Sequence, residues 1–111
     1  MINMTLNEKL KTFRNVLNEL NIDVYHYDAL DAKSEYIVWA ESGESSSLTA
    51  DNEKKEQSIG GTIDLFTQTE YNNIVDELQD KLNKNKISFV LNSVQYEDET
   101  KLIHYEWEFE I

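Results

Sequence analysis

Leu102-Ile103-His104-Tyr105-Glu106-Trp107-Glu108-Phe109-Glu110-Ile111 alternates, from Ile103 onward, between apolar or aromatic residues and polar or acidic ones. Successive side chains of a β-strand point to opposite faces, so this pattern predicts a strand with one face in a core and an acidic face outside. A shift of one residue would bury three carboxylates. We therefore expect this strand to have a strongly fixed register and to anchor a sheet.

The composition is that of one folded domain spanning residues 1–111. The chain is 40% hydrophobic and 11% aromatic, and these residues recur periodically, which favours a packed core over disorder. The chain has no cysteine, which excludes disulfides and thiolate metal sites. No apolar run approaches the roughly 20 residues that span a bilayer. The N-terminus lacks a basic and then apolar secretion signal, so we expect a cytoplasmic protein.

The charge balance is strongly acidic. Ten basic and 22 acidic residues give a net charge of −12. A protein that grips nucleic acid or docks on anionic membrane needs a basic surface. The composition therefore argues against both of these partners.

Two amphipathic helices are predicted. Over residues 5–20, Thr5 and Glu8 form a capping box, and an apolar stripe follows at helical spacing: Leu6, Leu10, Phe13, Leu17 and Leu20. In the second helix, Thr67-Gln68-Thr69-Glu70 is the expected capping box, and the stripe consists of Tyr71, Ile74, Val75, Leu78 and Leu82. Asn85 is the expected end of this helix.

Three or four strands are expected between the helices. Val24, Tyr25 and Tyr27 indicate a short strand, and residues 36–40 form an apolar strand. That second strand is either central and covered on both faces, or an interface strand with one face waiting for another subunit. Residues 48–50 suggest a short returning strand, and residues 51–56 a solvated turn or a charged strand edge. Residues 57–66 form the next strand, with one face made of Ile59, Gly61, Ile63 and Leu65.

Gly60-Gly61 within this strand indicates a bulge or a close backbone approach. A phosphate-binding loop is the alternative, but no Gly-Lys-Ser/Thr follows the pair.

A hairpin is expected at the end of the chain. Ile87, Phe89 and Leu91 alternate, and the apolar phase then reverses at Val94 and Tyr96, which predicts a β-bulge around residues 92–93. Residues 97–101 form the turn. The order α-β-β-(β)-β-α-β-β predicts an α+β fold with two helices packed on one face of a mainly antiparallel sheet.

The sequence shows no enzymatic signature. His26 and His104 lie in different predicted strands; His104 shares a face with Glu106 at about 7 Å, so a metal site is possible, but a solvated sheet face is the preferred interpretation. The row Glu106, Glu108 and Glu110 lacks the contrasting environments of an acid–base pair. It predicts an open aqueous face, or one met by basic residues such as Lys9, Lys11 and Arg14. We expect no catalytic residue, metal or cofactor.

One stretch of small polar residues predicts a mobile loop or hairpin tip that is a candidate docking loop. This stretch consists of Glu41, Ser42, Gly43, Glu44, Ser45, Ser46, Ser47 and Leu48. Its serines have no nucleophile-elbow pattern.

Several short blocks of residues 36–111 together resemble a known family. They are Tyr36-Ile37-Val38-Trp39-Ala40-Glu41, Leu48-Thr49-Ala50-Asp51-Asn52, Gln57 with Gly61-Thr62-Ile63-Asp64-Leu65-Phe66-Thr67, and Ile103-His104-Tyr105-Glu106-Trp107. The chain resembles the small head–tail joining proteins of long-tailed phages and prophages, the tail-completion or tail-terminator proteins, also called minor capsid proteins. The pattern contains no catalytic motif.

The resemblance implies an α+β subunit that forms a ring, usually a hexamer, caps the tail tube and docks to the head connector. DNA passes through the ring without being gripped. The implied location is the host cytoplasm and then the virion neck. Six copies at −12 each would total −72, and an acidic lumen would repel phosphate. A neighbouring adaptor of the head connector, and an acidic DNA-mimic or interaction module, remain the alternatives; a small-molecule enzyme ranks last.

Overall fold

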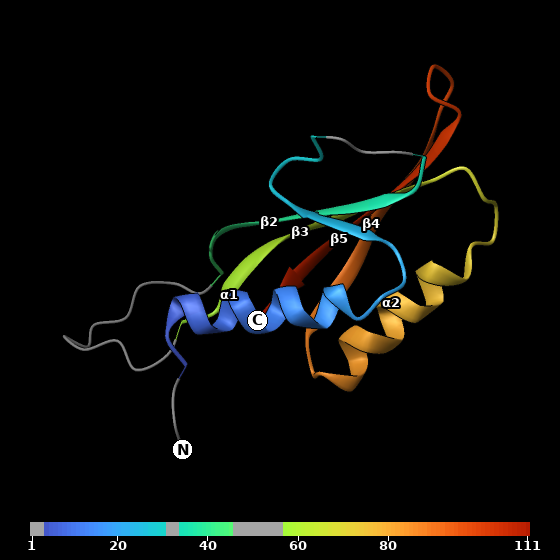
Figure 1. Ribbon diagram of the computed structural model, residues 1–111. Helices are drawn as coiled ribbons and strands as arrows, with labels where there is room; N and C mark the ends of the chain where they lie inside the picture. The colour runs from blue at the N-terminus through green and yellow to red at the C-terminus, as the bar shows by residue number, and fades with distance from the viewer. Residues whose placement is uncertain (1–3, 31–33, 46–56) are drawn as a thin grey trace.

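A computed structural model describes residues 4–30, 34–45 and 57–111 (Figure 1). Its elements, in chain order, are α1 (Leu6–Asn18), β1 (Asp23–His26), β2 (Tyr36–Glu44), β3 (Ile59–Thr67), α2 (Asn73–Lys84), β4 (Ser88–Glu97) and β5 (Leu102–Glu110). The five strands form one sheet in the order β1-β2-β3-β5-β4. β1 runs parallel to β2, and the other neighbours are antiparallel. Both helices pack on the same side of the sheet (Figure 1), which confirms the predicted α+β fold.

β5 anchors the sheet as its alternation predicts. The strand lies between β3 and β4, and Trp107 pairs with Ile63 on one side and Leu91 on the other. Trp107 and Phe109 are buried, and Tyr105 and Ile111 pack against the core. The apolar face of β5 therefore points at the helices.

The helices close the core over β2, β3 and β5. Phe13 of α1 stacks on Phe109 with ring centroids 4.1 Å apart and meets Trp39 edge-on at 5.1 Å. The predicted capping box is confirmed: Thr5 accepts a hydrogen bond from the Glu8 backbone, and the Glu8 carboxylate accepts one from Thr5. Two side chains differ from the prediction. Val16, which lies outside the predicted stripe, is buried, and Leu6, which lies within it, is exposed.

The second predicted capping box is wrong. α2 begins at Asn73, and Asn72 is its N-cap, whose side chain accepts a hydrogen bond from the Ile74 backbone. Thr67 is instead the buried last residue of β3, and its hydroxyl donates to the Glu35 carboxylate. Tyr71 adopts a positive φ of 58° and is exposed, so it does not belong to the helical stripe.

β2 continues beyond its predicted end, so the first part of the candidate docking loop is strand and not loop. Residues 41–44 extend the strand and pair with β3 across a bulge between Glu41 and Gly43. Pairing with β3 gives the backbone groups of residues 41–44 hydrogen-bond partners that a free loop would lack. This gain outweighs the preference of small, polar residues for a loop. Ser45 follows the strand, and its backbone N–H donates to the Ser58 carbonyl. Ser46, Ser47 and Leu48, the strand expected at 48–50 and the turn expected at 51–56 lie outside the described residues.

The glycine pair lies inside β3, where it makes the predicted close approach. A Cβ placed on Gly61 would lie 2.2 Å from the Ala40 carbonyl oxygen, so only glycine fits between the β2 backbone and Phe109. The neighbouring bulge belongs to β2 and not to the glycine strand. Gly60 and Gly61 both pair with β2 and β5, an arrangement unlike a phosphate-binding loop. The bulge predicted in the final hairpin is confirmed between Leu91 and Ser93.

Candidate functional site

The sheet has one face that the two helices do not cover, called here the open face. Its central part is made by alternate residues of three strands: Tyr36, Val38, Ala40, Thr62, Asp64, Phe66, His104, Glu106 and Glu108. The predicted acidic row lies here. Glu106 stands opposite Asp64, Glu108 opposite Thr62, and Glu110 opposite Gly60. Glu106 is half-buried, whereas Glu108 and Glu110 are exposed.

A row of aromatic rings crosses the open face at one end. Tyr36 stacks on Phe66 with centroids 4.8 Å apart, and Phe66 stacks on His104 at 4.3 Å. Tyr25 of β1 meets Tyr36 edge-on at 6.3 Å. All four side chains are half-buried. The row spans β1, β2, β3 and β5, and it exists because the strand register places these residues side by side.

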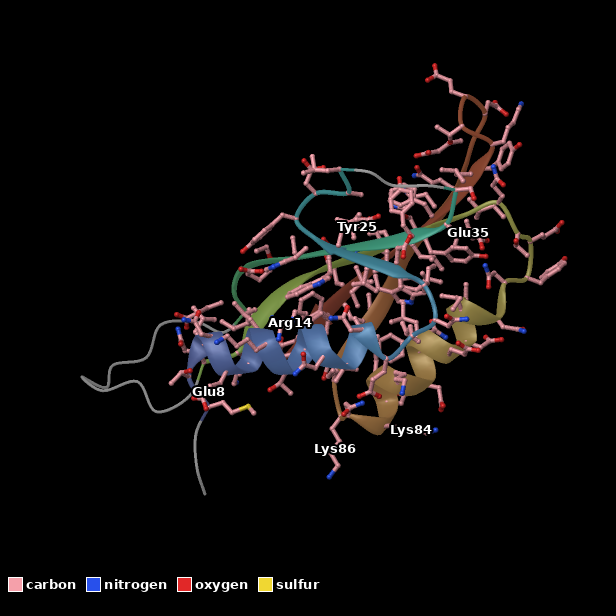
Figure 2. All side chains as sticks on the ribbon, in the orientation of Figure 1. Glu8, Arg14, Tyr25, Glu35, Lys84 and Lys86 are labelled. Atoms are coloured by element: carbon pink, nitrogen blue, oxygen red, sulfur yellow. The ribbon has the colours of Figure 1, made fainter. Side chains whose placement is uncertain are left out.

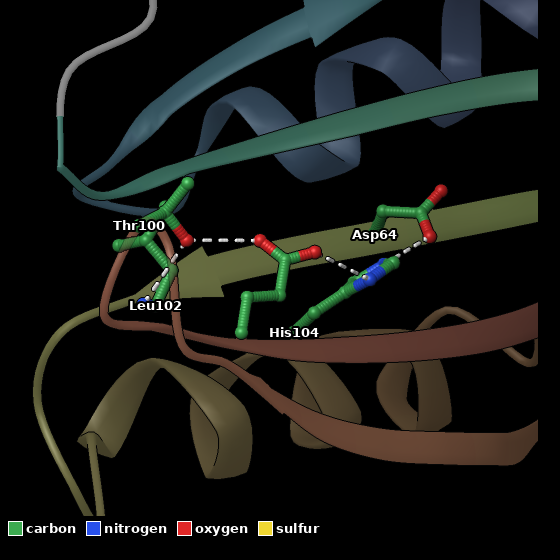
Figure 3. A network of polar contacts seen from close by, with 5 residues as sticks. Asp64, Thr100, Leu102 and His104 are labelled. Carbon is green, nitrogen blue, oxygen red and sulfur yellow. Dashed lines mark hydrogen bonds and ion pairs between the residues drawn. The ribbon is translucent and has the colours of Figure 1, made fainter.

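His104 is held by carboxylates from two other strands (Figure 3). Its Nε2 lies 2.7 Å from Asp64 Oδ1, and its Nδ1 lies 3.9 Å from Glu97 Oε2. Thr100 in the hairpin turn donates a hydrogen bond of 3.0 Å to Glu97 and thereby orients that carboxylate. Stacking on Phe66 and the hydrogen bond with Asp64 both fix the His104 imidazole. This arrangement stabilises the open face of the sheet.

A second polar cluster joins the ends of β1 and β2. The His26 ring lies between Trp39 and Tyr27, with centroids 3.8 Å from each. Its Nε2 is 2.7 Å from a Glu41 carboxylate oxygen, and the Tyr27 hydroxyl donates to the other oxygen. Tyr27 adopts a positive φ of 74°, which is uncommon for a non-glycine residue.

This cluster shifts two pKa values. Burial raises the pKa of Glu41, but hydrogen bonds from Tyr27 and His26 outweigh it and hold that pKa below its ordinary value of 4.5. The hydrogen bond to Glu41 raises the pKa of Tyr27 above its ordinary 10.0. The contribution of Glu41 to stability is present above its ordinary pKa and lost as the pH falls below it. The contribution of Tyr27 is present below 10.0 and lost at more alkaline pH.

The two histidines do not combine into one site. His26 stacks on Trp39, on the helix side, whereas His104 lies on the open face. Within the described parts of the chain, no group of three histidine or acidic side chains is arranged to hold a metal ion. The basic residues of α1 cannot meet the glutamate row of their own chain, because α1 packs on the other face. Figure 2 shows Arg14, Lys84 and Lys86 on the helix side of the sheet.

The two predicted sets of site residues meet in one groove. An open depression of about 500 Å³ at the end of the sheet farther from the aromatic row is lined by Ser42 and Ser45 from the predicted docking loop and by Glu108 and Glu110 from the acidic row. Gly60 and Gly61 also line it, and Ser42 donates a hydrogen bond of 3.2 Å to the Gly60 carbonyl. The β2-β3-β5 register creates this proximity, which no spacing in the sequence indicates.

Sequence reasoning missed Asp64 and the contacts of Glu41 with His26 and Tyr27, although Glu41 itself belongs to the predicted docking loop. Asp64 stands between Ile63 and Leu65 in the alternating strand, and this position predicts an outward carboxylate. Its pairing with His104 depends on strand order. Tyr27 and Glu41 are 14 residues apart, and their contact requires the parallel pairing of β1 with β2.

Comparison with protein-family models found no match, and comparison with curated proteins also found none. Among the described residues, no helix has the length and apolar character needed to cross a membrane. The geometry of the surface is therefore the basis for a functional proposal.

Proposed function

We propose that this protein is a structural subunit of a phage or prophage head–tail junction. In this role it is a tail-completion protein that forms a ring, caps the tail tube and docks to the head connector. The observation that carries the proposal is the open face, a broad acidic surface left uncovered by both helices. Its carboxylates form a regular row on β5 with Asp64 beside it, unlike the contrasting pair in a cleft that acid–base catalysis needs.

In such a ring, the open face lines the passage for DNA. Asp64, Glu106, Glu108 and Glu110 then present negative charge to the phosphate backbone. Repulsion keeps the DNA from adhering to the wall as it moves. The groove that joins Ser42 and Ser45 to this face is the surface for a neighbouring protein of the neck. This arrangement gives the net charge of −12 a role in transport rather than in binding.

The assembly is tested by purifying the protein alone and with tail tubes from the same phage genome. We expect the purified protein to form rings on the ends of the tubes, visible by negative-stain electron microscopy, and not to bind isolated portal protein. Rings that bind portal protein but not tubes would identify a head-connector adaptor instead. Stable monomers that bind neither would contradict the proposal, and capture of a basic host protein by those monomers would indicate an acidic interaction module.

The acidic passage is tested separately by charge reversal. The double variant Glu108→Lys/Glu110→Lys should assemble into normal particles and then slow or stall DNA ejection, because the passage attracts phosphate. The matched control is Glu70→Lys/Glu77→Lys, which makes the same change in charge at exposed residues of the α2 region. Ejection is measured by the release of DNA from purified particles on addition of receptor. Equal rates in the two variants would show that the open face does not line the passage.

A further inference from the structure

β4 forms an unpaired edge of the sheet. It pairs with β5 on one side and has no neighbour among the described strands on the other. Outward backbone N–H and C=O groups of such a strand are free to pair with another chain. β4 is 10 residues long, whereas β1 at the opposite edge has 4. The backbone at the end of β1 is also partly occupied, because the His26 carbonyl accepts from the Asp28 N–H. β4 is therefore the larger available edge.

From Ser88 to Tyr96, β4 carries neither a charged residue nor proline, although a bulge protects part of its edge. Natural edges carry charged residues, especially lysine, or proline, which oppose pairing with a second chain. The longest uncharged stretch of this sequence runs from Ile87 to Tyr96, although 29% of the chain is charged, and the chain contains no proline. A bulge interrupts the strand between Leu91 and Ser93, but residues 93–97 pair regularly with β5. The segment after the bulge is thus regularly paired with β5 and uncharged up to Glu97.

Apolar side chains flank this edge on both faces. Val90, Leu91, Val94 and Tyr96 are each between 44% and 58% exposed. Val94 and Tyr96 lie on the helix side, because they stand opposite Tyr105 and Ile103 of β5. The β4–β5 hairpin extends beyond the helices (Figure 1). Val94 and Tyr96 are 50% and 58% exposed. An unpaired backbone beside exposed apolar side chains is the arrangement that binds an added strand.

We propose that β4 binds β4 of a second copy of this chain, antiparallel, around a two-fold axis that passes through residues 93–96. The charge pattern selects this partner. Each copy carries −12, so repulsion between two copies opposes contact least where neither presents charge, and β4 is the edge whose residues 88–96 are uncharged. The antiparallel direction places the two Glu97 carboxylates at opposite ends of the pair, whereas parallel pairing would set them side by side. Val94 and Tyr96 of both copies then form one apolar cluster.

This contact is distinct from a ring contact. A two-fold contact closes after two copies, whereas a ring is built from two different surfaces on each subunit. The pair is the form of the free chain, and it stands whether or not the ring exists.

The mass of the free protein is the first test. By size-exclusion chromatography with light scattering, the wild type should have twice the chain mass of 13.0 kDa, and Val94→Lys should have 13.0 kDa. Lysine in the middle of an edge strand opposes pairing. Leu30→Lys is the matched control, because it adds the same charge at an exposed apolar residue outside the sheet, and it should keep the wild-type mass. If Val94→Lys does not fold by circular dichroism, Gln95→Lys replaces it.

Cysteine cross-linking tests the two-fold symmetry. The chain has no cysteine, so Ser93→Cys, Val94→Cys and Gln95→Cys each introduce a single thiol. Only a two-fold contact brings a residue next to itself, and at least one variant should form disulfide dimers under mild oxidation while Leu30→Cys stays uncross-linked. A wild type at 13.0 kDa at micromolar concentration would overturn the proposal. So would an assembly whose mass Val94→Lys leaves unchanged, or one in which no β4 cysteine cross-links.

Discussion

Of the three glycines in the chain, Gly61 has the least room for a side chain. Its Cα faces the β2 backbone, and a methyl group there would overlap the Ala40 carbonyl oxygen and lie 2.8 Å from both Glu41 Cα and a Phe109 ring atom. Two of these neighbours are backbone atoms of a paired strand and cannot turn away. Gly61 lines the groove on the open face, but a Cβ on it would point to the helix side, toward the Phe109 ring.

The variant Gly61→Ala should destabilise the protein by about 2 kcal/mol or more, because the added carbon forces β2 and β3 apart. Gly60→Ala is the control, since its added carbon would meet its nearest neighbour at 3.5 Å, an ordinary contact. Urea unfolding followed by tryptophan fluorescence measures both. Equal stabilities for the two alanine variants would contradict the close approach at Gly61.

At the scale of the element, α2 illustrates how tertiary contacts choose a helix start. Thr67-Gln68-Thr69-Glu70 has the composition of a capping box, but the Thr67 hydroxyl binds Glu35, in the segment before β2. Asn72 contacts both, with its amide nitrogen 3.0 Å from the Glu35 carboxylate and 2.9 Å from the Thr67 hydroxyl. Its side-chain oxygen caps α2. One asparagine thus links the end of β3, the entry to β2 and the start of a helix.

Asn72→Ala should therefore lower the free energy of unfolding by about 1 to 2 kcal/mol, the usual cost of a lost N-cap. Glu70→Ala should change it by less than about 0.5 kcal/mol, as expected for an exposed residue outside any cap. Thermal unfolding by circular dichroism compares the two. A larger loss for Glu70→Ala would restore the capping box at residues 67–70.

At the scale of the whole molecule, charge is the dominant property. Acidic residues exceed basic ones by 12, and the open face concentrates carboxylates on β3 and β5. Two described ion pairs join lysines of α2 to carboxylates at the surface: half-buried Lys81 with exposed Glu19, and Lys84 with Asp80, both exposed. Surface pairs of this kind contribute about 0 to 1 kcal/mol each. Repulsion among the excess carboxylates therefore outweighs the attraction within these ion pairs.

Stability should accordingly rise with salt. Raising sodium chloride from about 10 mM to about 150 mM shortens the screening length from roughly 30 Å to 8 Å, and relief of repulsion should raise the melting temperature by a few degrees. In Glu108→Gln/Glu110→Gln, the increase should be smaller, because two repelling charges are absent. Differential scanning calorimetry measures both proteins. A melting temperature that falls with added salt would show that ion pairs dominate the balance.

Much of the fold follows from periodicity. The alternation of residues 103–111, the first capping box, the phase reversal near residue 92 and the two apolar stripes predict the helices, the final hairpin and their order, because each signal depends on neighbours close in sequence. The structure confirms these elements. The start of α2 and the end of β2 are exceptions, since distant partners satisfy the backbone and side-chain groups there: Glu35 holds Thr67, and β3 pairs with residues 41–44.

The candidate surface divides in the same way. The sequence by itself determined that β5 has an acidic face, because alternation places Glu106, Glu108 and Glu110 on one side of a strand. Only the tertiary structure decided which residues and which strand edge lie beside that face. The strand order β1-β2-β3-β5-β4 brings Asp64 to His104, brings Ser42 to the glutamate row, and leaves β4, whose residues 88–96 are uncharged, as an edge. Strand order is set by burial of the shared core, a property of the whole chain that no local spacing encodes.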